Sequence, residues 1–514
     1  MASPTTRRTR RLLRIARVFA RYDILGAMIE LGAVPAAFRV LVPIFRSRKT
    51  RHLRIGERLA LAAQELGPTF IKAGQTLSTR ADIVGEEVAA DLSGLQDRLP
   101  PFPAAAARAT IEAEIGQPID ALFLEFDDTA VAAASIAQVH FAIATDGRPV
   151  AVKVLRPNIE KQFADDLDLF DVAATLVERW QPKLRRLKPR AVVATLRESV
   201  RIEMDLRFEA AAASELAENF EGDSGFRIPK VDWERTGRRV LTLERVGGLR
   251  VGDVEAFAAA GVDPRIALAN ASRAFFKQVF RDGFFHADMH AGNAFVDPKD
   301  GAIIAIDFGI MGRLDKRNRY FLADMLLGFL NGDYARVAQV HFDAGFVPAN
   351  QSLPLFTQAV RSIGEPLMGR PLSEISLGRL LAQLFQITET FQMETQPQLL
   401  MLQKTMLMAE GMGRQLDPSV NMWELAQPLI EDWMIENRGP TARIGQAVED
   451  GIALFERLPR LVESLDRLTQ RLEKEGAAID PASLEQVDEY KRPRFAIPAI
   501  LWVLIGIALG AALL

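Results

Sequence analysis

One segment, residues 284–309, constrains the fold more than any other part of the chain. It reads FFHADMHAGNAFVDPKDGAIIAIDFG and carries Asp288, Asn293 and Asp307 in that order. A His-x-Asp with an asparagine five residues after the aspartate, followed by Asp-Phe-Gly, is typical of kinase-like phosphotransferases. We therefore predict that Asp288 is catalytic and accepts a proton from, or orients, the attacking group. Asn293 and Asp307 are predicted to bind Mg²⁺, which prefers oxygen ligands.

The two histidines of this segment allow another interpretation. A zinc site would need His286 and His290 on one helical face, together with a third ligand. The chain has no H-E-x-x-H motif, and Gly292 favours a loop over a helix. We expect His286 to make a structural contact in the loop. His290 stands where many protein kinases have a lysine, so it is expected near the γ-phosphate.

Upstream, the segment VHFAIATDGRPVAVKVL predicts a β-hairpin. Residues 139–144 and 149–155 form two β-rich runs joined by an Asp-Gly turn. The second run contains Lys153, at the place where a kinase-like lysine neutralises the α- and β-phosphates. That lysine needs an acidic partner on a helix. Glu209 is the best candidate, in the stretch EMDLRFEAAA.

The glycine-rich loop that covers nucleotide phosphates in protein kinases is missing. The chain has Ala132, Ala133, Ala134 and Ser135 in its place. Alanine carries a Cβ and resists positive φ, so this loop cannot wrap phosphates as glycines do. Backbone donors and the hydroxyl near Ser135 remain able to approach a nucleotide. No Ala-Pro-Glu follows Asp-Phe-Gly, so the usual peptide-substrate platform is not expected.

Together these motifs resemble the UbiB family of atypical kinases, which is linked to ubiquinone biosynthesis. The resemblance covers roughly residues 50–420 and rests on FIKAGQTLSTR, LQDRLPPFP, AAASIAQVH, EMDLRFEA, HADMHAGN and DFG. It implies an α+β, two-lobed protein-kinase-like fold with an added N-terminal helical extension that lies across the active site. It also implies Mg²⁺-dependent ATP binding and ATPase activity, with weak or absent activity on proteins.

The resemblance assigns roles to further residues. Lys72 and Gln75 of K-x-G-Q should reach into the nucleotide site, with Lys72 counted as catalytic. Three residues apart on a helix, they share one face, although a surface lysine has the same pattern. The nucleotide-binding set also includes Lys153, Glu209, the alanine loop, Glu203 and Asp205 of E-x-D, and Glu244. The family usually has proline where Ala291 stands, a departure that removes no ligand.

The predicted organisation has six parts. They are a basic membrane-facing arm (1–50), a helical extension (51–120), a kinase-like N-lobe (121–250), a C-lobe (251–420), a helical tail (421–494) and a transmembrane helix (495–514). The Met-rich run at residues 399–413 is predicted to be a core helix and not a cofactor box.

The last 20 residues carry no charge. As a helix they span about 30 Å, the thickness of the bilayer core, although a buried helix remains the alternative. Lys491, Arg492 and Arg494 precede them, so the rest of the chain is expected in the cytoplasm. We expect a bacterial inner membrane, with the mitochondrial inner membrane as the alternative. Gly506 and Gly510 are a weak sign of helix association and thus of a homo-oligomer.

The start of the chain is strongly basic. Residues 1–60 hold 14 Lys and Arg against 3 Asp and Glu, whereas the whole chain has a net charge of −3. Leu12, Ile15, Ala16 and Phe19 share one helical face, which predicts a helix lying on an anionic leaflet. The charge-free C-terminal segment favours lipid over nucleic acid as the anionic partner. The chain has no cysteine, which excludes disulfides and thiolate chemistry.

Together with these features, the resemblance to the UbiB family implies a membrane-anchored atypical kinase or ATPase that supports ubiquinone biosynthesis. It would act on polyprenyl intermediates in the bilayer or on the enzymes that process them. A small-molecule or lipid phosphotransferase is one alternative, and a non-catalytic scaffold is another. Direct hydroxylation of a polyprenylphenol is disfavoured, because the chain has no flavin fingerprint and no iron-binding triad.

Overall fold

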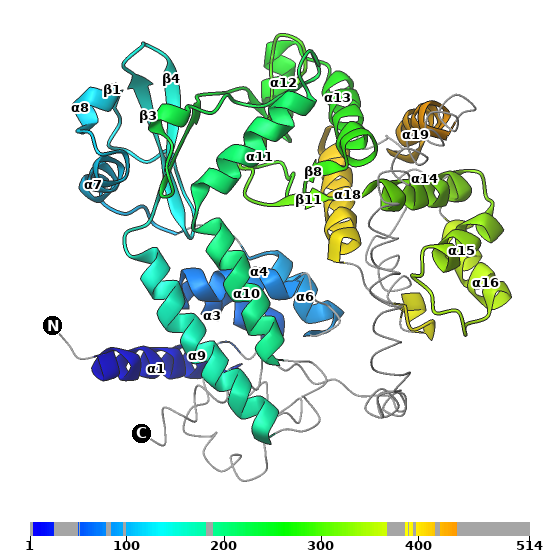
Figure 1. Cartoon of the computed structure of the whole chain (residues 1–514), viewed down its shortest axis with the longest axis horizontal. Helices are drawn as coiled ribbons and strands as arrows, with labels where there is room; N and C mark the ends of the chain where they lie inside the picture. Colours follow the sequence, from blue (N-terminus) through cyan, green and yellow to red (C-terminus); the bar gives the residue numbers. More distant parts are fainter. Residues whose placement is uncertain are drawn as a thin grey trace, which may run out of the picture.

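The computed structural model describes residues 4–24, 50, 52–78, 84–95, 99–180, 189–366, 386–388, 390–393, 397–416 and 422–438. Within them, a β-rich lobe and a mostly helical lobe lie side by side, and further helices pack below the β-rich lobe (Figure 1). The kinase-like α+β architecture predicted from the motifs is present.

The β-rich lobe is built on a five-stranded antiparallel sheet. Its strand order is β1-β3-β4-β6, with β2 paired to β3. The bounds are β1 (Phe123–Phe126), β2 (Ala132–Ala133), β3 (Ala137–Ala144), β4 (Pro149–Leu155) and β6 (Val240–Glu244). The predicted hairpin is confirmed: β3 and β4 pair in register, and Gly147 at the turn has a φ of 84°. That conformation favours glycine.

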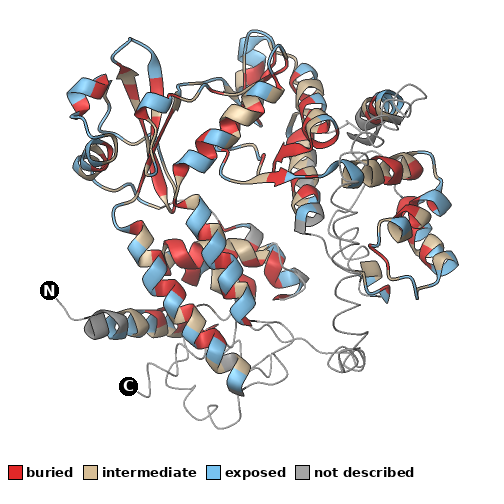
Figure 2. Ribbon diagram, viewed as in Figure 1, coloured by how far each residue is buried: buried red, intermediate tan, exposed pale blue. Residues whose placement is uncertain are grey.

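Helices cover the two faces of this sheet. α7 (Ala104–Ile115) and α8 (Ile119–Leu122) pack through Ile111 and Leu122 against Val152 and Val240. From the other face, buried residues such as Leu155 join a large apolar cluster with the N-terminal helices. Buried residues of the sheet therefore belong to two apolar clusters, and Figure 2 marks the buried residues in red.

Three helices follow β4 along the chain. They are α9 (Ile159–Trp180), α10 (Pro189–Glu203) and α11 (Leu206–Asn219). α9 and α10 pack with α3 (Ile55–Leu66), α4 (Pro68–Ser78) and α6 (Glu86–Ser93), outside the sheet. The N-terminal extension and the β-rich lobe are thus interleaved along the chain.

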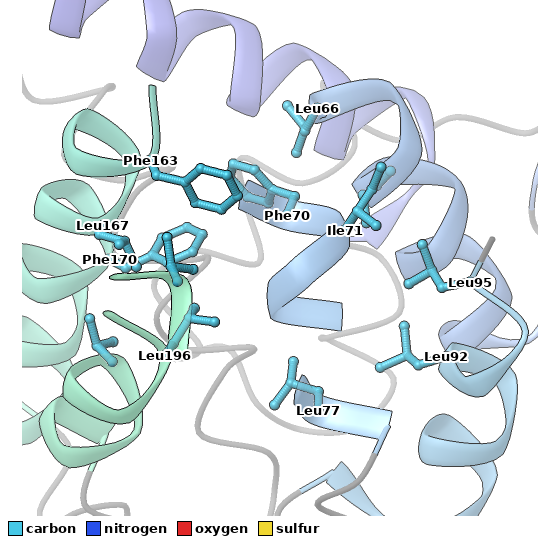
Figure 3. Close-up of a cluster of buried hydrophobic side chains, with 14 of the residues drawn as sticks. Leu66, Phe70, Ile71, Leu77, Leu92, Leu95, Phe163, Leu167, Phe170 and Leu196 are labelled. Carbon is cyan, nitrogen blue, oxygen red and sulfur yellow. The ribbon is translucent and has the colours of Figure 1, made fainter. Parts of the chain in front are cut away.

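Aromatic side chains hold this helical part together. Phe70 on α4 is buried, with its ring centroid 6.4 Å from that of Phe19 and 5.0 Å from that of Phe170 on α9. Phe163, Leu167 and Phe170 face α4 from one side, and Leu92 and Leu95 approach it from the other (Figure 3). α4, which carries the K-x-G-Q motif, is therefore fixed on both sides.

The first helix packs in a way that the sequence did not predict. The apolar face of α1 (Pro4–Arg21) buries Ile15 and Phe19 in the same cluster, and Leu12 packs beside them. Arg11 forms an ion pair of 2.6 Å with Asp166 of α9. The prediction that these apolar residues lie on a leaflet is therefore corrected. An amphipathic helix can pack against a protein core as well as against a membrane, and here its apolar face packs in the core.

The helical lobe contains two small sheets, β5-β10-β9-β7 and β11-β8. Their strands are β5 (Phe226–Arg227), β7 (Leu249–Arg250), β8 (Phe284–His286), β9 (Ala294–Val296), β10 (Ile303–Ala305) and β11 (Met311–Arg313). The helices are α12 (Val254–Ala260), α13 (Pro264–Phe276), the π-helix η5 (Lys277–Asp282), α14 (Lys316–Leu330), α15 (Tyr334–Asp343), α16 (Leu353–Gly364), α18 (Pro397–Leu416) and α19 (Met422–Arg438).

α18 contains the Met-rich run, and its packing confirms a core helix. Leu402 and Met412 are buried, and Met401 and Met406 pack against the same helical lobe. No helix among the described residues is long and apolar enough to cross a membrane. The predicted transmembrane helix at residues 495–514 and most of the predicted tail lie outside the described residues.

We predict that Phe70→Ala lowers the free energy of unfolding of the extension by about 3–5 kcal/mol, because it opens a cavity between α1, α4 and α9. Leu13→Ala is the control on α1, since Leu13 is 50% exposed, and should cost no more than about 0.5 kcal/mol. Urea unfolding followed by circular dichroism measures both variants. Similar losses in the two would show that Phe70 is not a packing centre.

Candidate nucleotide-binding site

Lys153 lies at the centre of a charged cluster that joins the two lobes. Its Nζ donates to Oε1 and Oε2 of Glu209 at 2.7 and 2.9 Å. It also donates to Oδ1 of Asp307 at 3.0 Å. These residues come from β4, α11 and the turn after β10, so one ammonium group links three elements. The structure thus brings together the predicted lysine, its predicted partner and the Asp-Phe-Gly aspartate.

Burial and charge shift the pKa values of this cluster in different directions. Burial disfavours the charged form of Lys153, but the carboxylates of Asp307 and Glu209 outweigh it and raise the pKa. Burial raises the pKa of Glu209 to about 7, with Asp307 adding to the effect and Lys153 opposing it. The Lys153 charge holds the pKa of Asp307 far below its usual range.

Asp307 is the open member of the cluster. Its side chain is 50% exposed, whereas those of Lys153 and Glu209 are 17% and 7% exposed. Its φ is 63°, in the left-handed region that aspartate tolerates better than most residues. A ligand can therefore reach the Asp307 carboxylate from solvent while Glu209 continues to bind the ammonium of Lys153.

Asp288 and Asn293 lie on one tight loop between β8 and β9. Nδ2 of Asn293 donates to the backbone oxygen of Asp288 at 3.2 Å, and the backbone N–H of Asn293 donates to the backbone oxygen of His290. The side-chain nitrogen is thus occupied, which leaves Oδ1 as the amide atom suited to a cation. The N–H of Ile306 donates to the backbone oxygen of Asn293. This hydrogen bond joins the loop to the end of the strand before Asp307.

The two histidines accept hydrogen bonds from backbone N–H groups of this loop. His286 is buried, accepts the backbone N–H of Asp288 at Nδ1, and its Nε2 lies 3.4 Å from the oxygen of Ile306. Burial lowers its pKa, so it is neutral at pH 7. His290 accepts the N–H of Gly292 at Nδ1. The described residues contain no group of three or more His, Cys, Asp or Glu that could hold a metal ion.

The alanine loop lies along β3. Ala132 and Ala133 form β2, the N–H of Ala134 donates to Ala137, and Ser135 is buried. None of the loop alanines has a positive φ, in keeping with their Cβ atoms. Arg156 donates to the oxygen of Ala134 from Nε and NH2, at 3.0 and 2.8 Å.

Arg156 also joins this loop to the L-P-P-F-P segment. It donates to the oxygen of Pro100 at 2.9 Å and lies over the ring of Phe102. Phe102 in turn exchanges two hydrogen bonds with the side chain of Gln138 on β3. The sequence singled out both segments but not Arg156, because nothing local marks an arginine that bridges them.

The K-x-G-Q and E-x-D motifs meet each other. Nζ of Lys72 on α4 lies 2.6 Å from Oε1 of Glu203, the last residue of α10. Asp205 caps the N-terminus of α11 by accepting the N–H of Arg207. The helix that carries Glu209 therefore begins at a junction that Lys72 holds in place. The ammonium of Lys72 is paired with Glu203 here and not with Asp307 or Asp288.

Two other predicted residues lie near the edges of this region. Gln75 is on α4, one turn after Lys72, and is partly buried. Glu244 ends β6 and is exposed, where its carboxylate accepts the N–H of Lys230 at 3.3 Å. The predicted nucleotide contacts of both residues stay predictions.

A lysine that the sequence analysis did not consider completes the region. Nζ of Lys404 on α18 donates to Oδ1 of Asp288 at 2.9 Å. The two residues are 116 positions apart. No spacing rule connects them, and the Met-rich run around Lys404 indicated only a core helix.

Two domain models match the chain. The ABC1 atypical kinase-like domain covers residues 94–341, and the UbiB helical domain covers residues 360–421. All the members of the charged cluster, with Asp288 and Asn293, fall within the first range. Lys404 falls within the second.

Curated relatives match over most of the chain. A probable protein kinase UbiB of Marinobacter nauticus is 46% identical, over 85% of this chain and 81% of the relative. Another, of Pseudomonas entomophila, is 43% identical over 90% of this chain and 87% of the relative. A solved structure titled as a complex of Rv3197 and erythromycin, from Mycobacterium tuberculosis, overlaps 79% of this chain with 23% identity and a TM-score of 0.46. That overlap is too loose to add to the fold assignment.

We predict that Asp205→Ala lowers the free energy of unfolding by about 1 kcal/mol, because α11 loses its N-cap. Amide hydrogen exchange should also rise in the first turn of α11, around Glu209. The matched control is Asp253→Ala, which removes the equivalent cap of α12. If both variants leave the exchange of residues 206–210 unchanged, Asp205 does not order the helix that presents Glu209.

Proposed function

Because this chain belongs to the UbiB family of atypical kinases, we propose that its charged cluster binds magnesium–ATP and that Asp288 directs the fate of the γ-phosphate. The observation that carries this proposal is the placement of Lys153 between Glu209 and Asp307. A buried ammonium held by one enclosed and one open carboxylate is the arrangement that positions a lysine for nucleotide phosphates.

The donor set at the site fits the proposed ligands. Oxygen atoms of Asp307 and Asn293 suit a hard cation, and no thiolate competes with them, because the chain has no cysteine. Asp307 and Asn293 would hold Mg²⁺, which would supply positive charge against the phosphates. Lys153 would bind phosphate oxygens, and Glu209 would hold its ammonium in place.

Asp288 would then accept a proton from, or orient, the attacking group. Its carboxylate is 27% exposed and lies beside Asn293 on the same loop, so an incoming hydroxyl or water can reach it. The neutral His286 behind it accepts its backbone N–H and fixes the loop without adding charge. These residues support both hydrolysis of ATP and transfer of its phosphate.

The family's link to ubiquinone biosynthesis leads to the proposed target. We propose that ATP use acts on polyprenyl intermediates in an inner membrane or on the enzymes that process them. Arg10 and Arg17 of α1 are exposed and lie away from its docked apolar face. They support contact with an anionic surface without insertion of that face. The charge-free residues 495–514 support anchoring.

Asp307→Asn should weaken Mg²⁺-dependent binding of a non-hydrolysable ATP analogue at least about 10-fold, or about 1.4 kcal/mol. The reason is that the amide removes the open negative charge of the cluster. Isothermal titration with and without Mg²⁺ measures the change. Asp315→Asn is the control, since Asp315 is an exposed helix cap outside the cluster. Equal affinity in the two variants would exclude Asp307 as a metal ligand.

ATP hydrolysis by the full chain should rise when anionic liposomes and a phenolic quinone precursor are added. The assay follows γ-labelled ATP, so phosphate released to water and phosphate transferred to the lipid fraction are separated. Lys72→Ala and Asp307→Asn are the comparison variants. If neither lipid nor precursor changes turnover, ATP use is not coupled to the membrane. Label in the lipid fraction would identify a lipid phosphotransferase.

A further inference from the structure

The ion pair between Lys404 and Asp288 has no place in the proposed function so far. The lysine comes from α18, in the part matched by the UbiB helical domain, and the aspartate from the catalytic loop of the kinase-like domain. Nζ and Oδ1 are 2.9 Å apart, in hydrogen-bond geometry. The side chains are 41% and 27% exposed, so the pair is partly accessible to solvent and not in the core.

The backbone that presents Lys404 is well anchored. Leu402 and Thr405, on either side of it, are 4% and 0% exposed. Leu402 packs in a cluster with Phe276, Phe280 and Trp433. α18 lies beside β8 and β11, the strands that flank the catalytic loop and the Asp-Phe-Gly turn (Figure 1). A side chain on a packed helix is held more precisely than one on a loop.

The catalytic loop has no such cation of its own. Residues 286–293 contain no lysine or arginine. His290 stands where a lysine is common in protein kinases, but its Nδ1 is engaged by the N–H of Gly292. Lys153 is engaged by Glu209 and Asp307. Lys404 is the ion-pair partner that the structure gives to Asp288.

A carboxylate beside the phosphates of ATP needs a nearby positive charge. The negative phosphates repel it and would turn it away from the attacking group. A cation bonded to Oδ1 offsets the repulsion. It also fixes the rotation of the carboxyl group and leaves Oδ2 free for the attacking hydroxyl or water.

We infer that Lys404 is a positioning residue: through its ion pair with Asp288, the UbiB helical domain supplies the cation that the catalytic loop lacks. This inference rests on the proposed role of Asp288 in ATP chemistry. It makes the helical domain part of the active site and not only a neighbour of it. The competing interpretation is a tie between α18 and the loop with no role in the reaction, since exposed ion pairs often contribute little.

The test uses the full chain with Lys404→Met, Lys404→Arg and the control Gln403→Met, each alone and with Asp288→Asn. Gln403 is the exposed neighbour on α18. Three quantities are measured: single-turnover release of labelled γ-phosphate, the Kd for a non-hydrolysable ATP analogue with Mg²⁺, and hydrogen exchange of amides 288–293 without nucleotide. The hydrogen-exchange measurement needs no ligand and shows directly whether Lys404 orders the catalytic loop.

Lys404→Met is expected to slow phosphate release about 100-fold, the scale of a misplaced catalytic group, and to change the Kd far less. Exchange of amides 288–293 should rise. Lys404→Arg should recover most of the rate, because it keeps the charge. In the Asp288→Asn background Lys404→Met should have little further effect, since the lysine acts through the aspartate. Gln403→Met should behave like the parent chain.

An unchanged rate in Lys404→Met would overturn the inference. So would an equal loss with and without Asp288→Asn, because that result assigns the effect to helix packing or to a direct phosphate contact. The proposed function fails separately, if the unaltered chain neither binds nor cleaves ATP. In that case, unchanged hydrogen exchange of amides 288–293 in Lys404→Met would also show that Lys404 does not order the catalytic loop.

Discussion

The arrangement of this molecule depends on one ammonium group shared by two carboxylates. Lys153 ties the central sheet to α11 through Glu209 and to the helical lobe through Asp307. Separating Glu209 from it would leave a buried carboxylate without its partner, which costs far more than an exposed pair would return. The relative placement of β4, α11 and the Asp-Phe-Gly turn is therefore set by electrostatics as well as by packing. The same geometry leaves Asp307 open to solvent and Glu209 enclosed.

The helices outside the kinase-like core reach this site through two further ion pairs. α4 of the extension meets the end of α10 through Lys72 and Glu203, just before the helix that carries Glu209. α18 meets the catalytic loop through Lys404 and Asp288. The extension and the helical domain thus each provide a lysine that pairs with an acidic residue of the kinase-like domain. Aromatic packing around Phe70 and the buried face of α18 fix the helices from which these lysines extend. Parts that look peripheral in the cartoon are therefore coupled to the proposed chemistry.

The sequence predicted what local patterns determine. The Asp-Gly hairpin, Lys153 on its second strand and the loop around Asn293 follow from turn chemistry and from motif spacing, and Glu209 was found because the lysine needed an acid. Contacts between distant segments were not predictable in this way. Arg156 bridges two loops, and Lys404 meets an aspartate 116 residues away. The helical face of α1 was assigned to a membrane because amphipathicity alone does not distinguish a lipid surface from a protein core.

A crystal structure with Mg²⁺ and a non-hydrolysable ATP analogue tests the central claim most directly. The account predicts phosphate oxygens within hydrogen-bond distance of Lys153 Nζ, a cation on Asp307 and Asn293, and Lys153 still bonded to Glu209. A nucleotide bound elsewhere, or a cation that contacts neither Asp307 nor Asn293, would contradict it.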